Sequence, residues 1–316
     1  MKVCSPLLLL IFGFLLFTGC KDENPADPGY VPGKNRYTII SDDTEREYYV
    51  HVPADYNEDE ETPVVFMLHG TSGNGNDMWD RSGWKEVGES ENILTVFPSS
   101  LRYCIIDEGQ QKNITKWNTV PVEWEFCPTE DPRDDIRFLT DIIAEITDRF
   151  SIDEKRIYLV GFSNGGQMSS KASVEMGDKF AAVISNAGSF YFDTTYIPKR
   201  KLPTTFQIGN EDYGPGGTGP EIPLSKIDLV LSDTQYRAAK VASTHIKTFG
   251  LSPDYIITGD TNTAVIATYP SLTPGSPNDY RFVFVKGLKH AYPNGENHWM
   301  EAAVLHWQWL KQYSIP

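Results

Sequence analysis

A serine between two glycines is the strongest chemical signal in this chain. Residues 161–165 read Gly-Phe-Ser-Asn-Gly and fit the pattern G-x-S-x-G, between a β-rich run and a helical run. In that context a sharp strand-to-helix turn strains the serine backbone, and larger side chains at either glycine would clash. A glycine-rich turn with a capping serine is the alternative. We expect Ser163 to be a nucleophile for acyl transfer.

Acyl transfer also needs backbone N–H groups that hold the oxyanion. The N–H of Asn164 would lie at the N-terminus of the following helix, where the helix dipole favours negative charge. A second donor is expected in the loop after the apolar run 63–68, which reads His69-Gly70-Thr71. We assign the Thr71 N–H to this role, because Gly70 allows close approach of the backbone. We expect His69 to hold this loop by a hydrogen bond.

A base and an acid should follow the serine along the chain, with the acid first. Asp212 follows the strand-like run 204–208 and is the predicted acid, with Glu211 as the alternative. The predicted base is His290, which follows the run 281–285. The competing histidines lie in predicted helices, and they are His245, His298 and His306.

Apolar periodicity around these positions alternates between strand and helix. A hairpin is predicted from 36–41 and 46–52, with further strands at 63–68, 93–97, 156–160, 180–185, 204–208 and 281–285. Helices are predicted at 134–150, 167–176 and 296–313. This order predicts an α/β fold with a mostly parallel sheet and helices on both faces. The stretches 99–133 and 211–232 are expected to be irregular, and loops of that length often carry function.

Composition narrows the class of protein. Hydrophobic residues make up 40% and charged residues 22% of the 316, which excludes disorder for most of the chain. The net charge of −15 argues against nucleic acid as a partner. No metal-binding spacing such as CxxC or HExxH is present, and no cofactor is expected. We expect one domain from residue 36 to residue 316.

The first residues predict export. Lys2 precedes an apolar run over 7–17, which is shorter than the roughly 20 residues of a membrane span and indicates a signal peptide over 1–19. Residues 17–20 read Phe-Thr-Gly-Cys and resemble a bacterial lipobox, in which Cys20 would carry lipid. An ordinary signal peptide with an incidental cysteine is the alternative. Residues 20–35 predict a flexible tether. The expected location is the outer membrane or cell surface, with the lipid anchor as the only membrane contact.

Two cysteines remain after removal of Cys4 with the signal and lipidation of Cys20. Cys104 and Cys127 would then meet an oxidising compartment, and we predict that they form a disulfide. Closing a loop of that length would stabilise the fold by about 3 kcal/mol. Two free buried thiols are the alternative.

The chain resembles a known group of enzymes at residues 134–136, 151–158, 161–166 and 180–183. It is similar to the polyhydroxybutyrate depolymerase and feruloyl/acetylxylan esterase group, which is like carbohydrate esterase family 1, over about residues 45 to 312. The nucleophile motif G-x-S-N-G-G is matched in full. The acid motif H-G-T-x-D departs to Ile-Gly-Asn-Glu-Asp at 208–212, and the histidine motif G-G-x-H-x-W-P becomes Gly-Leu-Lys-His-Ala-Tyr-Pro at 287–293. The resemblance implies an α/β-hydrolase with the triad Ser163, Asp212 and His290.

Aromatic residues near these positions bear on the substrate. Such rings suit a sugar or an aromatic acyl group, although packing of the loops is an equal alternative. The candidates for substrate contact are Trp117, Trp124, Tyr213, Tyr292 and Trp299. We expect an esterase that removes acetyl or feruloyl groups from plant polysaccharide. The alternatives are a polyester depolymerase, a peptidase on the same fold, and a non-catalytic glycan-binding lipoprotein.

Overall fold

The computed structural model describes residues 29–107, 109–119, 125–190 and 196–316. A compact unit extends from Val31 to Pro316. The predicted signal peptide, Cys20 and Trp124 lie outside the described residues. None of the helices in the described ranges combines the length and the hydropathy that a membrane-spanning helix needs.

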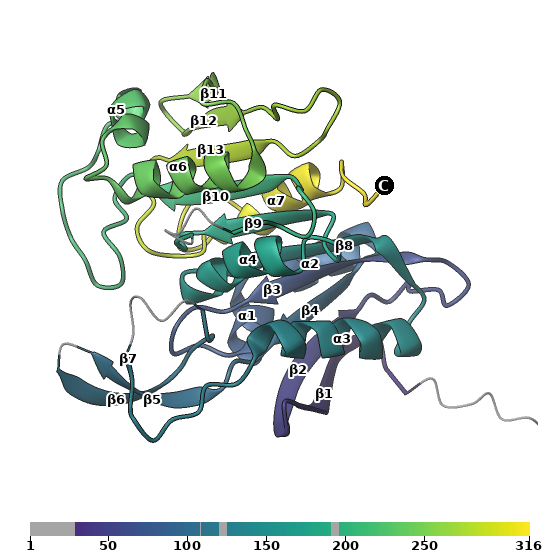
Figure 1. Cartoon of the computed structure of the whole chain (residues 1–316). Coiled ribbons are helices and arrows are strands. Elements are labelled where there is room, and N and C mark those ends of the chain that lie inside the picture. The colour runs from purple at the N-terminus through teal and green to yellow at the C-terminus, as the bar shows by residue number, and fades with distance from the viewer. Residues whose placement is uncertain (1–28, 108, 120–124, 191–195) are drawn as a thin grey trace, which may run out of the picture. The chain divides into compact units, whose positions relative to one another are not determined.

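A large sheet runs through this unit (Figure 1). Within the described residues it holds ten strands in the order β1-β2-β4-β3-β8-β9-β10-β13-β12-β11. The strands are β1 (Gly33–Ser41), β2 (Thr44–Val52), β3 (Thr62–Leu68), β4 (Leu94–Pro98), β8 (Ile152–Phe162), β9 (Ala182–Asn186), β10 (Thr204–Gly209), β11 (Ile256–Asp260), β12 (Ala264–Tyr269) and β13 (Tyr280–Val285). The six strands from β4 to β13 pair in parallel, and the flanking strands pair antiparallel. The predicted α/β fold with a mostly parallel sheet is confirmed.

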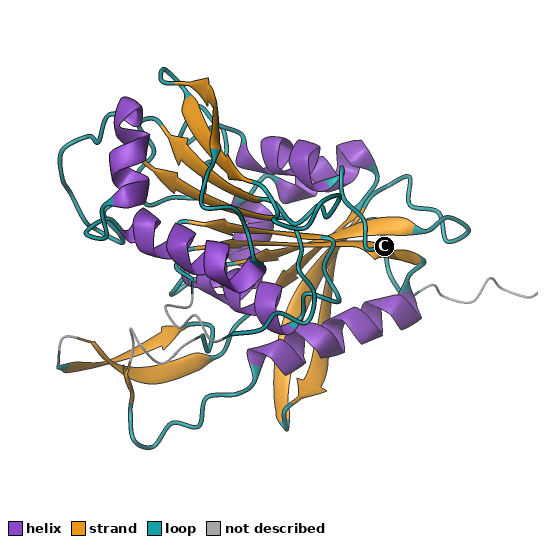
Figure 2. Ribbon diagram, turned by 45° about the horizontal axis from the view of Figure 1, so that its top comes forward, coloured by secondary structure: helices purple, strands orange, loops and turns teal. Residues whose placement is uncertain are grey.

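Helices cover both faces of the sheet, as the turned view shows (Figure 2). Those of the first face are α3 (Asp135–Arg149), α4 (Asn164–Glu175) and α6 (Arg237–Phe249), and those of the other are α1 (Gly75–Arg81), α2 (Trp84–Glu91) and α7 (Ala302–Leu310). A 3₁₀ turn, η1 (Leu224–Lys226), leads into the short helix α5 (Ile227–Ser232). Because both faces are covered, every residue of β3, β4, β9 and β10 is buried.

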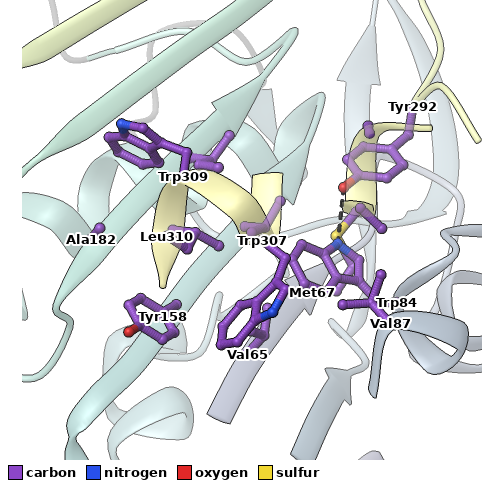
Figure 3. Close-up of a cluster of buried hydrophobic side chains, with 14 of the residues drawn as sticks. Val65, Met67, Trp84, Val87, Tyr158, Ala182, Tyr292, Trp307, Trp309 and Leu310 are labelled. Atoms are coloured by element: carbon purple, nitrogen blue, oxygen red, sulfur yellow. Dashed lines mark hydrogen bonds between the residues drawn. The ribbon is translucent and has the colours of Figure 1, made fainter. Parts of the chain in front are cut away.

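Large aromatic side chains fill the space between the sheet and helices α2 and α7 (Figure 3). Trp84 and Trp307 come from the two helices and are almost completely buried against Val65 of β3 and Tyr158 of β8. The indole N–H of Trp84 donates a hydrogen bond to the Tyr292 hydroxyl at 2.9 Å. This bond joins the segment after β13 to the core of the protein.

The parallel strands bring four chain segments to one edge of the sheet. Because β3, β8, β10 and β13 run in the same direction, the loops that follow them all begin at their carboxyl ends. These loops contain Thr71, Ser163, Asp212 and His290. The topology therefore gathers the residues that the sequence analysis singled out.

Two predicted boundaries are wrong. The tether was expected to reach residue 35, but β1 begins at Gly33, because residues 33–35 already pair with β2 and the Asn35 side chain binds both the N–H and the carbonyl of Val31. The closing helix was expected from residue 296, but α7 begins at Ala302. The Asn294 side chain accepts the N–H groups of Glu296 and Asn297, and this local turn competes with a helix.

The stretch 99–133 is more regular than expected. It contains a three-stranded sheet of β5 (Arg102–Asp107), β6 (Gln110–Thr115) and β7 (Glu125–Phe126), in the order β6-β5-β7. Strand β6 shows no apolar pattern that would predict it, because its residues are mostly polar and mostly exposed. Cys104 and Cys127 form a disulfide at this sheet, as predicted.

Candidate active site

Ser163 occupies a strained turn between β8 and α4. Its φ of 54° and ψ of −119° lie outside the regions that most residues with a side chain adopt. The Ser163 N–H donates to Asn186 O at 2.8 Å, which anchors the turn on β9. A Cβ at Gly161 would lie 2.1 Å from Gly165 O, and a Cβ at Gly165 would lie 2.4 Å from His69 O. Both glycines are therefore required by the close contact of backbones around the serine.

Ser163, His290 and Asp212 meet in one chain of hydrogen bonds. His290 Nε2 lies 2.9 Å from Ser163 Oγ, and His290 Nδ1 lies 3.0 Å and 3.1 Å from the two carboxylate oxygens of Asp212. The Asp212 side chain is 1% exposed and that of His290 is 10% exposed. A neutral imidazole with its proton on Nδ1 can thus accept the serine proton at Nε2, while the carboxylate holds its orientation.

The loops that carry the acid and the base are joined to each other. Asn210 Oδ1 accepts the Gly287 N–H at 2.7 Å, and the Asn210 N–H donates to Val285 O at 2.9 Å. The Glu211 N–H donates to Leu288 O at 3.1 Å. In the described residues no hydrogen bond joins the Glu211 side chain to His290, so the geometry favours Asp212 over Glu211. Asn210 departs from the acid motif, and in the structure this buried residue joins the two loops through its side chain and its backbone N–H.

His69 holds the loop after β3, as expected. Its Nδ1–H donates to Gly70 O at 2.7 Å, and its Nε2 accepts the Ser100 N–H at 2.9 Å. Burial lowers the pKa of His69 to about 4, so the ring is neutral at physiological pH. The ring is thereby a fixed donor and acceptor inside the protein, and it is separate from the chain of hydrogen bonds at Ser163.

Asn164 begins α4, directly after the serine. Its side chain is buried, with Oδ1 accepting the Trp117 N–H at 2.6 Å and Nδ2 donating to Gln167 Oε1 at 3.0 Å. The predicted helix started only at Gln167, so the structure adds three residues and places Asn164 in the first turn. Its backbone N–H is therefore one of the free donors of a helix N-terminus.

Two cavities adjoin the triad. One, of about 330 Å³, lies between the His69–Gly73 loop, which includes Thr71, and the segment from His290 to Asn297. Phe162 also lines this cavity. The second, of about 640 Å³, lies on the side of Asp212, with Tyr213 in its wall. Of the three triad residues, His290 lines the first cavity and Asp212 lines the second.

The aromatic candidates divide into different groups. Trp117 is completely buried, and its indole N–H donates to His69 O, so it supports the loop and does not contact a ligand. Tyr292 is 6% exposed and turns its hydroxyl into the core toward Trp84, although it also lines the cavity of about 330 Å³ (Figure 3).

Trp299 is exposed but lines a different cavity, of about 180 Å³, beside His306. Tyr213 is 39% exposed and lies next to Asp212.

The competing histidines have other partners. His298 lies before α7, outside any helix, and its Nε2 donates to Lys286 O at 2.9 Å. His245 is buried on α6 and stacks on Tyr280. His306, on α7, links the Tyr292 hydroxyl to Gln207 Oε1.

Among the described residues, no group of three His, Cys, Asp or Glu side chains is arranged to hold a metal ion.

The sheet order and the Ser–His–Asp geometry are those of the α/β-hydrolase class. Residues 41–208 match a family model described as "Putative esterase", and this match covers more than half of the chain. The chain therefore belongs to this esterase family.

Curated relatives cover only part of the chain. Feruloyl esterase B of Piromyces equi is 28% identical over 142 residues, which are 45% of this chain and 24% of that protein. The bifunctional acetylxylan esterase/xylanase XynS20E of Neocallimastix patriciarum is 25% identical over 163 residues, which are 52% of this chain and 21% of that protein. The chain thus spans less than a quarter of the length of these two relatives.

A solved structure is similar over most of the chain. The acetyl xylan esterase from Aspergillus awamori superposes with a TM-score of 0.58 at 12% sequence identity, over 88% of this chain and 99% of that one. At this identity the likeness establishes the α/β-hydrolase fold.

Proposed function

We propose that this chain is a serine carboxylic ester hydrolase with Ser163 as nucleophile, His290 as general base and acid, and Asp212 as the orienting carboxylate. The distance of 2.9 Å between His290 Nε2 and Ser163 Oγ carries this proposal, because proton transfer requires hydrogen-bond contact. Membership of the esterase family supports the same reaction.

The proposed reaction has two halves. Ser163 Oγ attacks the ester carbonyl carbon as its proton passes to His290 Nε2, and the N–H groups of Thr71 and Asn164 hold the oxyanion. The C–O bond to the alcohol then breaks, and His290 returns the proton to the departing oxygen. Water attacks the acyl-enzyme by the same route, releasing the carboxylic acid and restoring the Ser163 hydroxyl.

The proposed substrate is an acetyl or feruloyl ester on plant polysaccharide. Two of the partial relatives are named as feruloyl and acetylxylan esterases. The cavity beside His290 is lined by polar groups of Thr71, Asn294 and Asn297, which suit a hydroxyl-rich leaving group. The general acid must contact the leaving alcohol, so this cavity is the proposed site of the sugar.

We also propose that the protein is an exported lipoprotein anchored through Cys20, on the evidence of the apolar run and the lipobox-like residues before it. Metabolic labelling with palmitate tests this directly. The wild-type protein should take up label and fractionate with membranes, and Cys20→Ala should do neither. Equal labelling of both proteins would contradict the anchor.

The decisive experiment compares wild-type protein and Ser163→Ala on p-nitrophenyl acetate, methyl ferulate, acetylated xylan, a polyhydroxybutyrate film and a peptide. Wild-type protein should release acetate or ferulate, and Ser163→Ala should lose about 10⁶ in kcat. Full esterase activity of Ser163→Ala would refute the assignment. Cleavage of the film or the peptide alone would replace the substrate class, and sugar binding without any turnover would indicate a binding protein.

A further inference from the structure

Trp117 links the two segments that carry the proposed oxyanion donors. Its indole N–H donates to His69 O at 2.9 Å, and its backbone N–H donates to Asn164 Oδ1 at 2.6 Å. Its ring lies 5.0 Å from the His69 ring, centroid to centroid, and the side chain is completely buried. One residue therefore connects the loop after β3 with the first residue of α4.

The bond to His69 O also sets the direction of the next N–H group. The carbonyl and the N–H of a planar trans peptide point in opposite directions. Holding the His69 carbonyl on Trp117 consequently directs the Gly70 N–H away from Trp117. The next peptide is held in the same way, because Gly70 O accepts both the His69 Nδ1–H and the Gly73 N–H, which orients the Thr71 N–H.

The loop and the serine turn are in direct backbone contact. A Cβ at Gly70 would lie 3.1 Å from Ser163 Cβ, and a Cβ at Gly165 would lie 2.4 Å from His69 O. The loop and the serine turn are this close, so a displacement of the loop changes the distance between its N–H groups and the reacting carbon at Ser163. Stabilisation of an oxyanion requires donors at about 2.7–3.1 Å, so small displacements matter.

Trp117 is itself held by a rigid support. The N–H of the next residue, Asn118, donates to Asp135 Oδ2 at 2.6 Å. The other carboxylate oxygen of Asp135 pairs with Arg46 at 2.7 Å, and both of these side chains are 0% exposed. The position of Trp117 is thus set by the core and does not depend on a ligand.

We propose that Trp117 is a positioning residue for ester hydrolysis, which holds the Gly70–Thr71 backbone and the N-terminus of α4 at the spacing that the oxyanion requires. This inference rests on the proposed function. It assigns to Trp117 a role in the transition state and none in contacting the substrate.

The test is Trp117→Phe, which keeps a large buried ring and removes the N–H that binds His69 O. On p-nitrophenyl acetate we expect kcat to fall by about 10- to 100-fold, which is less than the roughly 10²–10³ lost when one oxyanion donor is removed, because the donor is displaced and not deleted. KM should change less than about threefold. The Ki of phenylboronic acid, whose tetrahedral adduct on Ser163 places an oxygen at the oxyanion position, should rise by a similar factor.

Trp307→Phe is the control for loss of a buried indole. Trp307 is also buried, and its ring packs against Tyr158 of β8 in the core between the sheet and helices α2 and α7. Both variants should lose thermal stability, while Trp307→Phe keeps kcat within about twofold, because Trp307 does not link the two segments that carry the proposed oxyanion donors. Equal kcat losses in the two variants would reduce Trp117 to a packing residue and overturn the inference.

Asn164→Ala tests the other end of the link, at the N-terminus of α4. This variant also tests the inference if Trp117→Phe does not fold. It should lower kcat with little change in KM, and the double variant should lose no more than the larger single loss, because both changes break one connection. If a folded Trp117→Phe or Asn164→Ala variant kept the wild-type kcat, the inference would be overturned and the proposed function would stand. An inactive wild-type protein, or an active Ser163→Ala, overturns the proposed function first.

Discussion

His290 Nε2 and Ser163 Oγ lie 2.9 Å apart although 127 positions separate them in the chain. The contact exists because the two residues follow β8 and β13, whose carboxyl ends face the same edge of the sheet. The Asp212 carboxylate completes the arrangement from the loop after β10. The reactive geometry is therefore a product of strand order.

The first prediction concerns the coupling of the two residues. Ser163→Ala and His290→Ala should each lower kcat on p-nitrophenyl acetate by about 10⁶, and the double variant should be no slower than either. The reason is that a base without its nucleophile, or the reverse, performs no step. Steady-state kinetics with purified protein measures this. Additive losses would show that the two side chains act independently.

The second prediction separates the two adjacent acids. Asp212→Asn keeps the shape of the side chain but removes its charge and favours the wrong imidazole tautomer, so kcat should fall by about 10⁴. Glu211→Gln is the matched control, and it should keep kcat within about twofold. Comparison of the two variants on one substrate is sufficient. A larger loss in Glu211→Gln would move the role of the acid to Glu211.

The third prediction concerns the disulfide. Replacing Cys104 and Cys127 together by serine should lower the free energy of unfolding by about 3 kcal/mol, because the bond closes a loop across 23 positions of the chain. Urea denaturation of both proteins without reductant measures the loss. With dithiothreitol present, the wild-type protein should unfold like the variant. A persistent difference under reducing conditions would assign the loss to packing of the serines.

The fourth prediction concerns acid stability. Complete burial lowers the pKa values of His245 and His306 to about 3, against about 6.5 in an unfolded chain. As pH falls from 6.5 toward 4, the unfolded chain binds protons on these rings and the folded protein does not, so stability decreases.

His245→Phe tests this linkage while keeping the ring that stacks on Tyr280. The variant removes one such proton, and its free energy of unfolding should change less steeply with pH, by up to about 1.4 kcal/mol per pH unit. Urea titrations at pH 6.5, 5.5 and 4.5 give both slopes. The carboxylates titrate equally in the two proteins and cancel in the comparison. Identical slopes would contradict the assignment of His245 as neutral in the fold.

Local sequence was sufficient for some residues. Ser163 could be predicted because Gly161 and Gly165 meet a steric requirement of the turn itself, and that requirement shows in five consecutive residues. The buried strand β3 was predictable because burial on both faces favours a continuous apolar run, which residues 63–68 show. The strand β6 was not, because its polar, exposed residues carry no such pattern.

The amino-acid sequence by itself determined the six strands of the parallel part of the sheet, the serine turn and the order of the predicted acid and base, because these depend on neighbours within a few residues. Only the tertiary structure decided which aromatic side chains face solvent and which support the site. Trp117 and Tyr213 are both aromatic residues in predicted loops, yet one is completely buried beneath His69 and the other is exposed beside Asp212. Burial of a side chain depends on contacts between segments that are distant in sequence. The residues next to it in the chain do not show which distant segments it will contact.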